Sequence, residues 1–293
     1  MTTHEAGRQK LLIVSSLVAL YFIWGSTYLA MRIAIESFAP FLMAAIRFSV
    51  AGATLYLFLR WRGSSAPTAR EWLSATIVGT LLLAMGNAVV AYVEQSVSSG
   101  VAALAMATVP LWMAFFSGFW GHWPHAKEWS GIVVGILGVA VLSSGSTLQA
   151  SPMGTFLLLF AAASFSFGSV WSKRLSMPAG AMSSATQMFA GGMVLMLMSV
   201  LHGESWPTQP TQNSILAIIY LITFGSLVAY SAYLFLLQTV RPALASSNAF
   251  VNPVVAVFLG VWLAGEHIGT AEYMALGIII IGVLLVLPFK LKE

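Results

Sequence analysis

Long apolar segments follow one another along almost the whole chain, and each is long enough to cross a lipid bilayer. A helix needs about 20 consecutive apolar residues to span the hydrocarbon core. Only 8% of the 293 residues are charged, whereas about 25% are charged in soluble domains. The sequence therefore predicts an all-α integral membrane protein. Its ten expected transmembrane helices lie near residues 11–34, 39–60, 72–93, 99–120, 128–145, 153–173, 180–201, 214–238, 242–264 and 272–289.

Positive charges are distributed unevenly between the connections. Cytoplasmic loops of membrane proteins carry an excess of Lys and Arg. With the N-terminus inside, the outer segments hold Arg32 alone, and Arg47 falls inside the second span. The cytoplasmic segments then hold Arg8, Lys10, Arg60, Arg62, Arg70, Lys127, Lys173, Arg174, Arg241, Lys290 and Lys292. We therefore expect both termini to lie in the cytoplasm.

The second half of the chain repeats the first. An offset of 143 residues superposes Pro110 on Pro253 and Gly25-Ser26 on Gly168-Ser169. We expect one five-helix repeat at residues 1–148 and a second at 149–293, joined in one transmembrane unit. Because five is odd, the second repeat enters the membrane from the opposite face. Inverted repeats are typical of secondary transporters, whose binding site lies near the midplane at the repeat interface.

The residue types that the chain lacks exclude several functions. It has no cysteine, and all nine of its acidic residues are glutamates. ATP-driven transport is not expected, because there is no Walker A motif and no Asp to carry a phosphate. His122 and His125 share a loop with no other ligand nearby, so we expect no metal site. No cofactor is expected. No nucleic-acid partner is expected either, since the basic residues lie at helix ends rather than in one patch.

Three motifs resemble a known family. Tyr21-Phe22-Ile23-Trp24-Gly25-Ser26-Thr27-Tyr28 lies in the first span, and Ser99-Gly100-Val101-Ala102-Ala103-Leu104 leads into Ala107-Thr108-Val109-Pro110-Leu111. Pro242-Ala243-Leu244-Ala245 leads into Phe250-Val251-Asn252-Pro253-Val254-Val255-Ala256. Together they resemble the EamA-type members of the drug/metabolite transporter superfamily, and closely the YedA-type exporters. The resemblance covers nearly the whole chain.

The resemblance implies a ten-helix inverted-repeat fold around a central cavity. Spans 1–4 and 6–9 would line that cavity, with spans 5 and 10 at the periphery. It also implies a bacterial inner-membrane exporter of amino acids, other metabolites or drugs. The expected partners are a small-molecule substrate and the lipid bilayer, and the protein is expected to be a monomer or a homodimer.

Two ionisable residues are candidates for function. Arg47 lies inside a span, where a charge usually faces a cavity or a partner. It would hold the carboxylate of an amino-acid-like substrate with both arms of its guanidinium group. Its alternative roles are to cap backbone carbonyls, to pair with Glu94 or to reach outward to the interface. Glu94, at the end of span 3, is the candidate for proton coupling, and its alternative is an interfacial carboxylate in water.

Polar and aromatic residues deep in the inward-facing spans form the remaining substrate-binding prediction. Asn248 and Asn252 lie one helical turn apart and so share a face of span 9. The other polar members are Asn87, Gln187, Tyr230 and Tyr233, and the members near the two Gly-Ser pairs are Trp24, Ser26, Thr27 and Trp171. The alternative is interhelical hydrogen bonding for the polar residues, and ordinary packing or an interfacial belt for the aromatic ones.

Pro110 and Pro253 are predicted to lie mid-span, where a proline removes one backbone hydrogen bond and weakens the helix. Pro110 would free the carbonyl of Met106, and Pro253 would free that of Ala249. We predict that the two prolines are hinges for opposite gates, with static kinks as the alternative.

Small residues also follow one face of span 5, at Gly131, Gly135 and Gly138, with Gly277 and Gly282 as a weaker counterpart in span 10. Such a face favours close helix packing. Dimerisation through these spans is the alternative.

The function predicted from these features is a secondary exporter that works by alternating access, and it is not an enzyme. One alternative is an uncoupled, channel-like facilitator. The other, a membrane-embedded enzyme, would need a nucleophile or an acid–base pair within the bundle. The missing Asp and Cys, and histidines confined to loops, argue against it.

Overall fold

The computed structural model describes residues 3–121, 123, 125–143, 152–240, 242–264 and 269–286, and the regular elements in these ranges are all helices. The prediction of an all-α protein is therefore confirmed for this part of the chain. Several of the predicted features lie outside it: His122, the repeat boundary at 148/149, Arg241, Lys290 and Lys292.

Helices follow one another through both halves of the chain, and η denotes a π-helical segment, in which the backbone hydrogen bonds reach one residue further than in an α-helix. The first half contains α1 (Thr3–Ala19), η1 (Leu20–Trp24), α2 (Gly25–Ala34), α3 (Pro40–Trp61), α4 (Ala69–Gly79), η2 (Thr80–Ala88), α5 (Val89–Val93), α6 (Ser99–Met106), α7 (Val109–Gly118) and α8 (Ala126–Ser143). The second half contains α9 (Pro152–Ser172), α10 (Ala181–Leu201), α11 (Gln212–Tyr220), η3 (Leu221–Val228), α12 (Ala229–Thr239), α13 (Pro242–Ala245), α14 (Asn248–Ala264) and α15 (Thr270–Val286).

Seven helical stretches of the described residues are long and apolar enough to cross a membrane. They are Gly7–Ala34, Pro40–Trp61, Ala69–Val93, Ser99–Gly118, Met153–Ser172, Ala181–Leu201 and Gln212–Thr239. All seven coincide with expected spans. Two shorter apolar helices, Val251–Leu263 and Tyr273–Gly282, lie where spans 9 and 10 are expected. The total of ten spans remains a prediction.

Local sequence signals explain where the long helices α3 and α10 end. Gly63 and Gly203 follow them with φ angles of +86° and +73°, a conformation that glycine adopts without strain. The next N–H then donates back five residues, from Ser64 to Leu59 and from Glu204 to Ser199, at 3.0 Å in both cases. This arrangement is the usual glycine stop at a helix C-terminus.

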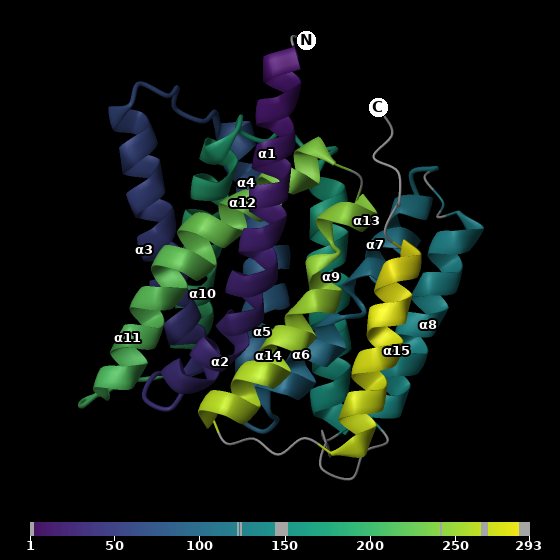
Figure 1. The fold of residues 1–293 in the computed structure, drawn as a ribbon. Coiled ribbons are helices and arrows are strands. Elements are labelled where there is room, and N and C mark those ends of the chain that lie inside the picture. The colour runs from purple at the N-terminus through teal and green to yellow at the C-terminus, as the bar shows by residue number, and fades with distance from the viewer. Residues whose placement is uncertain are drawn as a thin grey trace.

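The two halves are joined by pairs of helices that pack along each other. α3 packs along α10, and α8 packs along α15; Figure 1 shows these two pairs on opposite sides of the bundle. Glycines allow the close approach. A Cβ atom at Gly52 would lie 2.2 Å from the backbone nitrogen of Phe189, and one at Gly192 would lie 2.5 Å from that of Ser49.

The glycine face of α8 is covered by α15 of the same chain. A Cβ atom at Gly282 would lie 2.9 Å from the carbonyl oxygen of Gly131 and from the nitrogen of Gly135. The predicted close packing is therefore confirmed at Gly282. Gly277 does not take part, because nothing lies within 4 Å of its Cβ position.

The structure places Pro110 mid-span as predicted, close to a break in the helix. This proline does not interrupt a continuous helix, because α6 ends at Met106 and α7 begins at Val109. Pro110 stands in the first turn of α7, where a missing N–H costs no intrahelical hydrogen bond. Pro253 does lie inside a helix, α14, as predicted.

Candidate functional site

A central cavity lies between the two halves, lined by side chains from α2, α3, α5, α6, α7, α9, α12, α14 and all three π-helical segments. Traced by the centres of water-sized spheres, its volume is about 60 Å³, and one water molecule needs about 10–15 Å³ on that measure. The cavity thus has room for a few water molecules. A larger substrate would require it to open.

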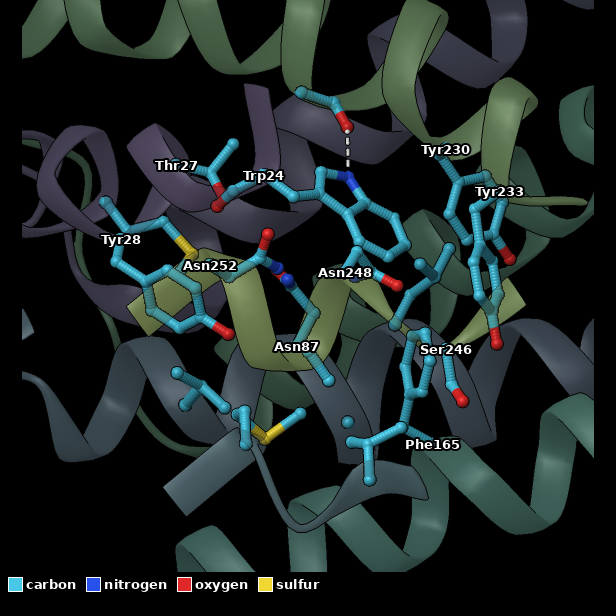
Figure 2. A pocket seen from close by; sticks show the side chains of 18 of the residues that line it. Trp24, Thr27, Tyr28, Asn87, Phe165, Tyr230, Tyr233, Ser246, Asn248 and Asn252 are labelled. Carbon is cyan, nitrogen blue, oxygen red and sulfur yellow. Dashed lines mark hydrogen bonds between the residues drawn. The ribbon is translucent and has the colours of Figure 1, made fainter. Parts of the chain in front are cut away.

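Most of the residues predicted to bind substrate meet at this cavity. The lining includes Trp24, Thr27, Arg47, Asn87, Tyr230, Tyr233, Asn248 and Asn252. Figure 2 shows the three asparagines at the centre, close to the indole ring of Trp24, with Tyr230 and Tyr233 to one side. Residues from five of the expected spans are therefore brought to one place.

Arg47 is the charged group of the cavity. It is 2% exposed, and its Nε donates to Ser226 Oγ at 2.8 Å while Nη1 donates to Asn87 Oδ1 at 3.3 Å. Its Cζ lies 4.6 Å from the ring centre of Phe48. Among the described residues, its hydrogen-bond partners are neutral, so the proposed pairing with Glu94 is not present. Burying a charge without an opposite charge is costly, which makes Arg47 a strong candidate for anion binding.

The space for Arg47 depends on Gly225 in η3. A Cβ atom at Gly225 would lie 2.9 Å from Arg47 Nη2 and 3.0 Å from Thr27 Cγ2. The carbonyl oxygen of Gly225 accepts a hydrogen bond from Trp24 Nε1 at 3.1 Å. The π-helical segment therefore presents a backbone carbonyl to the indole and leaves room for the guanidinium group.

Three aromatic rings form one wall of the cavity. The Trp24 ring lies 5.0 Å from that of Tyr233 and 6.1 Å from that of Phe165. The rings of Phe165 and Tyr233 are 5.2 Å apart. The Tyr233 hydroxyl donates to Ser169 Oγ at 2.7 Å, so it is held away from any ligand. This wall suits an apolar or aromatic group.

Asn248 and Asn252 offer acceptors to the cavity. Both side chains are at least 95% buried, at 5% and 3% exposed, and the Oδ1 atom of each has no hydrogen-bond partner in the described part of the structure. Asn248 begins α14 after a turn at Ser246 and Ser247. An unsatisfied buried acceptor costs about 1–3 kcal/mol. These two amides therefore favour a ligand or water molecules that donate hydrogen bonds.

Glu94 lies outside the lining of the central cavity. It follows α5, is 0% exposed and does not line the cavity. The alternative of a water-exposed interfacial carboxylate is therefore wrong. The neighbouring backbone is held by Arg32, whose Nη1 donates to the carbonyl oxygens of Glu94 and Val97.

Three predicted residues do not line the central cavity. Ser26 Oγ lies 2.6 Å from the Tyr220 hydroxyl, and Trp171 packs against Phe167 with ring centres 5.3 Å apart. Gln187 accepts a hydrogen bond from Tyr230 and faces a different cavity. For these residues the structure agrees with the alternative of interhelical bonding and packing.

Other lining residues were missed by the sequence reasoning. Phe165 and Ser246 line the cavity, and Ser226 binds Arg47 directly. Two signals were available. Phe165 precedes Ser169 by one helical turn, and Gly225-Ser226 repeats the Gly25-Ser26 dipeptide. Within the described residues, no group of three or more His, Cys, Asp or Glu side chains is placed to hold a metal ion.

The long apolar helices define a polytopic membrane protein, and a central cavity lies between its two halves. Comparison with known proteins agrees with this class. The EamA-like transporter family matches twice, at residues 11–144 and 152–287. The chain therefore belongs to the EamA-like transporter family.

Individual relatives extend over most of the chain. The chain is 46% identical to the "Uncharacterized inner membrane transporter YedA" of Escherichia coli (strain K12). The aligned 280 residues cover 95% of this chain and 92% of that protein. Protein PecM of Dickeya dadantii (strain 3937) is 26% identical over 274 residues, with coverage of 92% and 90%. A solved crystal structure with 20% identity has a TM-score of 0.73 and covers 93% of this chain and 95% of its own, which shows that the two share a fold.

Proposed function

We propose that this transporter is a secondary exporter of small metabolites, such as amino acids or drug-like compounds, and that it works by alternating access in a bacterial inner membrane. The name of the YedA relative, an inner membrane transporter, supports the assignment to the inner membrane. The observation that carries the proposal is Arg47, a buried guanidinium group in the central cavity with neutral partners. A substrate carboxylate would supply the missing negative charge.

The surrounding residues suit the rest of such a substrate. The wall of Trp24, Phe165 and Tyr233 would contact an apolar part. The free Oδ1 atoms of Asn248 and Asn252 would accept hydrogen bonds from its donor groups. A ligand that meets all three requirements is small and amphipathic. Because the cavity has room for only a few water molecules, it must widen toward each side in turn during transport.

We also propose ten spans in two inverted repeats, and the cavity lining supports this. At the 143-residue offset, equivalent residues from the two halves both line it. These pairs are Asn87 with Tyr230, Val90 with Tyr233, Met106 with Ala249 and Val109 with Asn252. A two-fold axis through the cavity would bring equivalent residues to it in this way. The double match to the family and the π-helical segments in α4–α5 and α11–α12 agree with the repeat.

The proposed orientation has both termini in the cytoplasm and rests on the charge bias of the loops. Cysteine labelling tests it without background, because the native chain has no cysteine. In intact cells, an impermeant maleimide should label Ser37→Cys, in the connection after α2, and should not label Ser64→Cys, in the connection after α3. The reverse pattern would overturn the orientation.

Transport by purified protein in liposomes tests the proposed function. Arg47→Lys keeps the charge but loses the forked geometry that binds a carboxylate at two points. We expect it to lower carboxylate-dependent transport about tenfold, which equals about 1.4 kcal/mol, while the yield of folded protein is unchanged. Arg60→Lys, at the exposed end of α3, is the matched control and should transport normally. Equal transport by Arg47→Lys would favour a purely structural arginine.

The second candidate is a facilitator without ion coupling. It is favoured by one observation: the described residues that line the central cavity include no carboxylate and no histidine. The same observation leaves no acid–base pair for an enzyme. Transport measured with and without a pH gradient separates coupled export from uncoupled flow. Coupled export would accumulate substrate against its gradient, and an uncoupled facilitator would only equilibrate it.

A further inference from the structure

A second cavity lies beside the central one, where α9 and α12 end and α10 begins. It is lined by the connection between α9 and α10 and by Ser183, Gln187, Leu234 and Gln238. On the same measure its volume is about 430 Å³, against about 60 Å³ for the central cavity. It is therefore roomy enough for a small organic molecule without any movement of the helices.

Two hydrogen-bonded side chains connect the linings of the two cavities. Tyr230 lines the central cavity, and its hydroxyl donates to Gln187 Oε1 at 2.7 Å; Gln187 lines the second cavity. Both side chains are buried, at 2% and 1% exposed. Gln187 is held in turn by Ser183, whose Oγ accepts from Nε2 at 2.9 Å. The hydrogen bond between α10 and α12 therefore joins a residue that lines one space to a residue that lines the other.

Neighbouring residues of α12 face opposite cavities. Tyr233 contributes to the central cavity and Leu234 to the second one. The Tyr233 hydroxyl binds Ser169 of α9 rather than a residue of the second cavity. Tyr233 is therefore a matched comparison for Tyr230, since both are buried tyrosines of one helix and only Tyr230 joins the two spaces.

The two cavities resemble each other chemically. Among the described residues that line them, each has one charged side chain, Arg47 in the central cavity and Lys173 in the second. Partial burial lowers the pKa of the Lys173 ammonium group, because it disfavours the charged form. Apolar side chains, including Leu175 and Leu237, complete the second cavity. A molecule with a carboxylate and an apolar part fits both places.

We propose that the second cavity is a loading site, which binds a small amphipathic carboxylate before it passes between Tyr230 and Gln187 into the central cavity. This proposal rests on the proposed transport function and deepens it. The carboxylate would first pair with Lys173 and then with Arg47. Passage requires the hydrogen bond between Tyr230 and Gln187 to break, so this pair controls access to the central cavity from the side of the N-terminus of α1 (Figure 1).

Protection from thiol labelling tests the loading site in the full chain. Gln238 is exposed and lines the second cavity, so Gln238→Cys places a thiol at this cavity. The probe is 4-phenylbutyrate, and 4-phenylbutan-1-ol is its neutral counterpart. We expect the acid to slow maleimide labelling about fivefold relative to the alcohol, which corresponds to an ion pair of about 1 kcal/mol. Lys173→Gln should abolish the difference. Arg174→Gln, which removes the neighbouring charge outside the cavity lining, should preserve it.

The proposed barrier, the hydrogen bond between Tyr230 and Gln187, is tested with a cysteine in the central cavity. In an Ala249→Cys background, Tyr230→Phe removes the hydroxyl that binds Gln187 and leaves a buried acceptor unpaired. We expect labelling of Ala249→Cys to become about tenfold faster, equal to about 1.4 kcal/mol. Tyr233→Phe, the matched control, should leave the labelling rate unchanged.

The outcomes separate this proposal from the transport function. Protection at Gln238→Cys does not require transport. Normal transport with equal protection by the acid and the alcohol would overturn the loading site alone. Intact protection without any transport in liposomes would count against the proposed function alone. Equal labelling rates in Tyr230→Phe and Tyr233→Phe would overturn the barrier.

Discussion

The two halves of the chain share a scaffold but contribute different chemistry to the central cavity. Where the second half places Tyr233 and Asn252, the equivalent positions of the first half hold Val90 and Val109. The charge is one-sided as well, because the position equivalent to Arg47 is Ala190. At these pairs the equivalent positions of both halves face the cavity but hold different residues, whereas Ala190 does not line it. In the proposed repeat, the two halves thus give the central cavity an asymmetric lining.

The proline segments differ in a related way. In the first half the helix is interrupted at Ala107 and Thr108, and the interruption ends two residues before Pro110. In the second half the interruption falls at Ser246 and Ser247, well before Pro253. At the repeat offset these breaks are four residues apart, about one helical turn. The earlier break is what makes Asn248 the first residue of α14, at the cavity.

The largest effect is expected where the halves touch most closely. Gly52→Leu would push a side chain into the backbone of Phe189, since even a Cβ atom would lie 2.2 Å from its nitrogen. We expect most of the folded protein to be lost, because overpacking costs about 1–3 kcal/mol or more. Gly282→Leu, at the α8–α15 pair, should lower the yield less, since its closest contact would be 2.9 Å. Size-exclusion chromatography of the membrane extract measures both.

Gly277→Leu is the control for these two variants. Nothing lies within 4 Å of its Cβ position, so its yield should match that of the native chain. If Gly282→Leu is as damaging as Gly52→Leu, the α8–α15 pair matters as much as the α3–α10 pair, and the comparison of the two contacts fails.

An intermediate effect is expected from exchanging cavity residues between the halves. Asn252→Val copies the first-half residue and removes one free acceptor. Transport should fall about tenfold, since a hydrogen bond contributes about 1–1.5 kcal/mol. Val109→Asn, the reciprocal change, adds an acceptor away from α14 and should not restore transport in the double variant. Restored transport would show that the cavity does not distinguish its two sides. Initial rates in liposomes provide the measurement.

The smallest effect is expected at the prolines, and it should be unequal. Pro253→Ala restores an N–H inside α14 that can bond the carbonyl of Ala249. We expect it to change the two-sided accessibility of a cysteine at Ser246 about threefold, equal to about 0.6 kcal/mol. Pro110→Ala should change it much less, because the first turn of α7 needs no such bond. Equal and opposite shifts would restore the idea of two equivalent hinges.

Much of this molecule follows from its sequence. Apolar length and the near absence of charge dictate helices in lipid, since each backbone polar group must be bonded within its own segment. The ends of α3 and α10 follow from Gly63 and Gly203. Most of the polar cavity residues could be predicted as well, because a polar side chain such as Asn87 or Arg47 has no favourable place against hydrocarbon.

The direction of individual side chains was decided by the tertiary structure. Each residue added to a helical turn rotates the following side chains by about 100°, so η1, η2 and η3 shift the faces that a regular period would predict. Ser26, just after η1, binds Tyr220 rather than lining the central cavity. Gln187 lies in the regular helix α10, and the packing of α10 against α12 places it at the second cavity. The second cavity and its proposed barrier exist only where α9, α10 and α12 meet. Sequence determines what each helix can bury, whereas packing against distant helices determines which atom each side chain finally contacts.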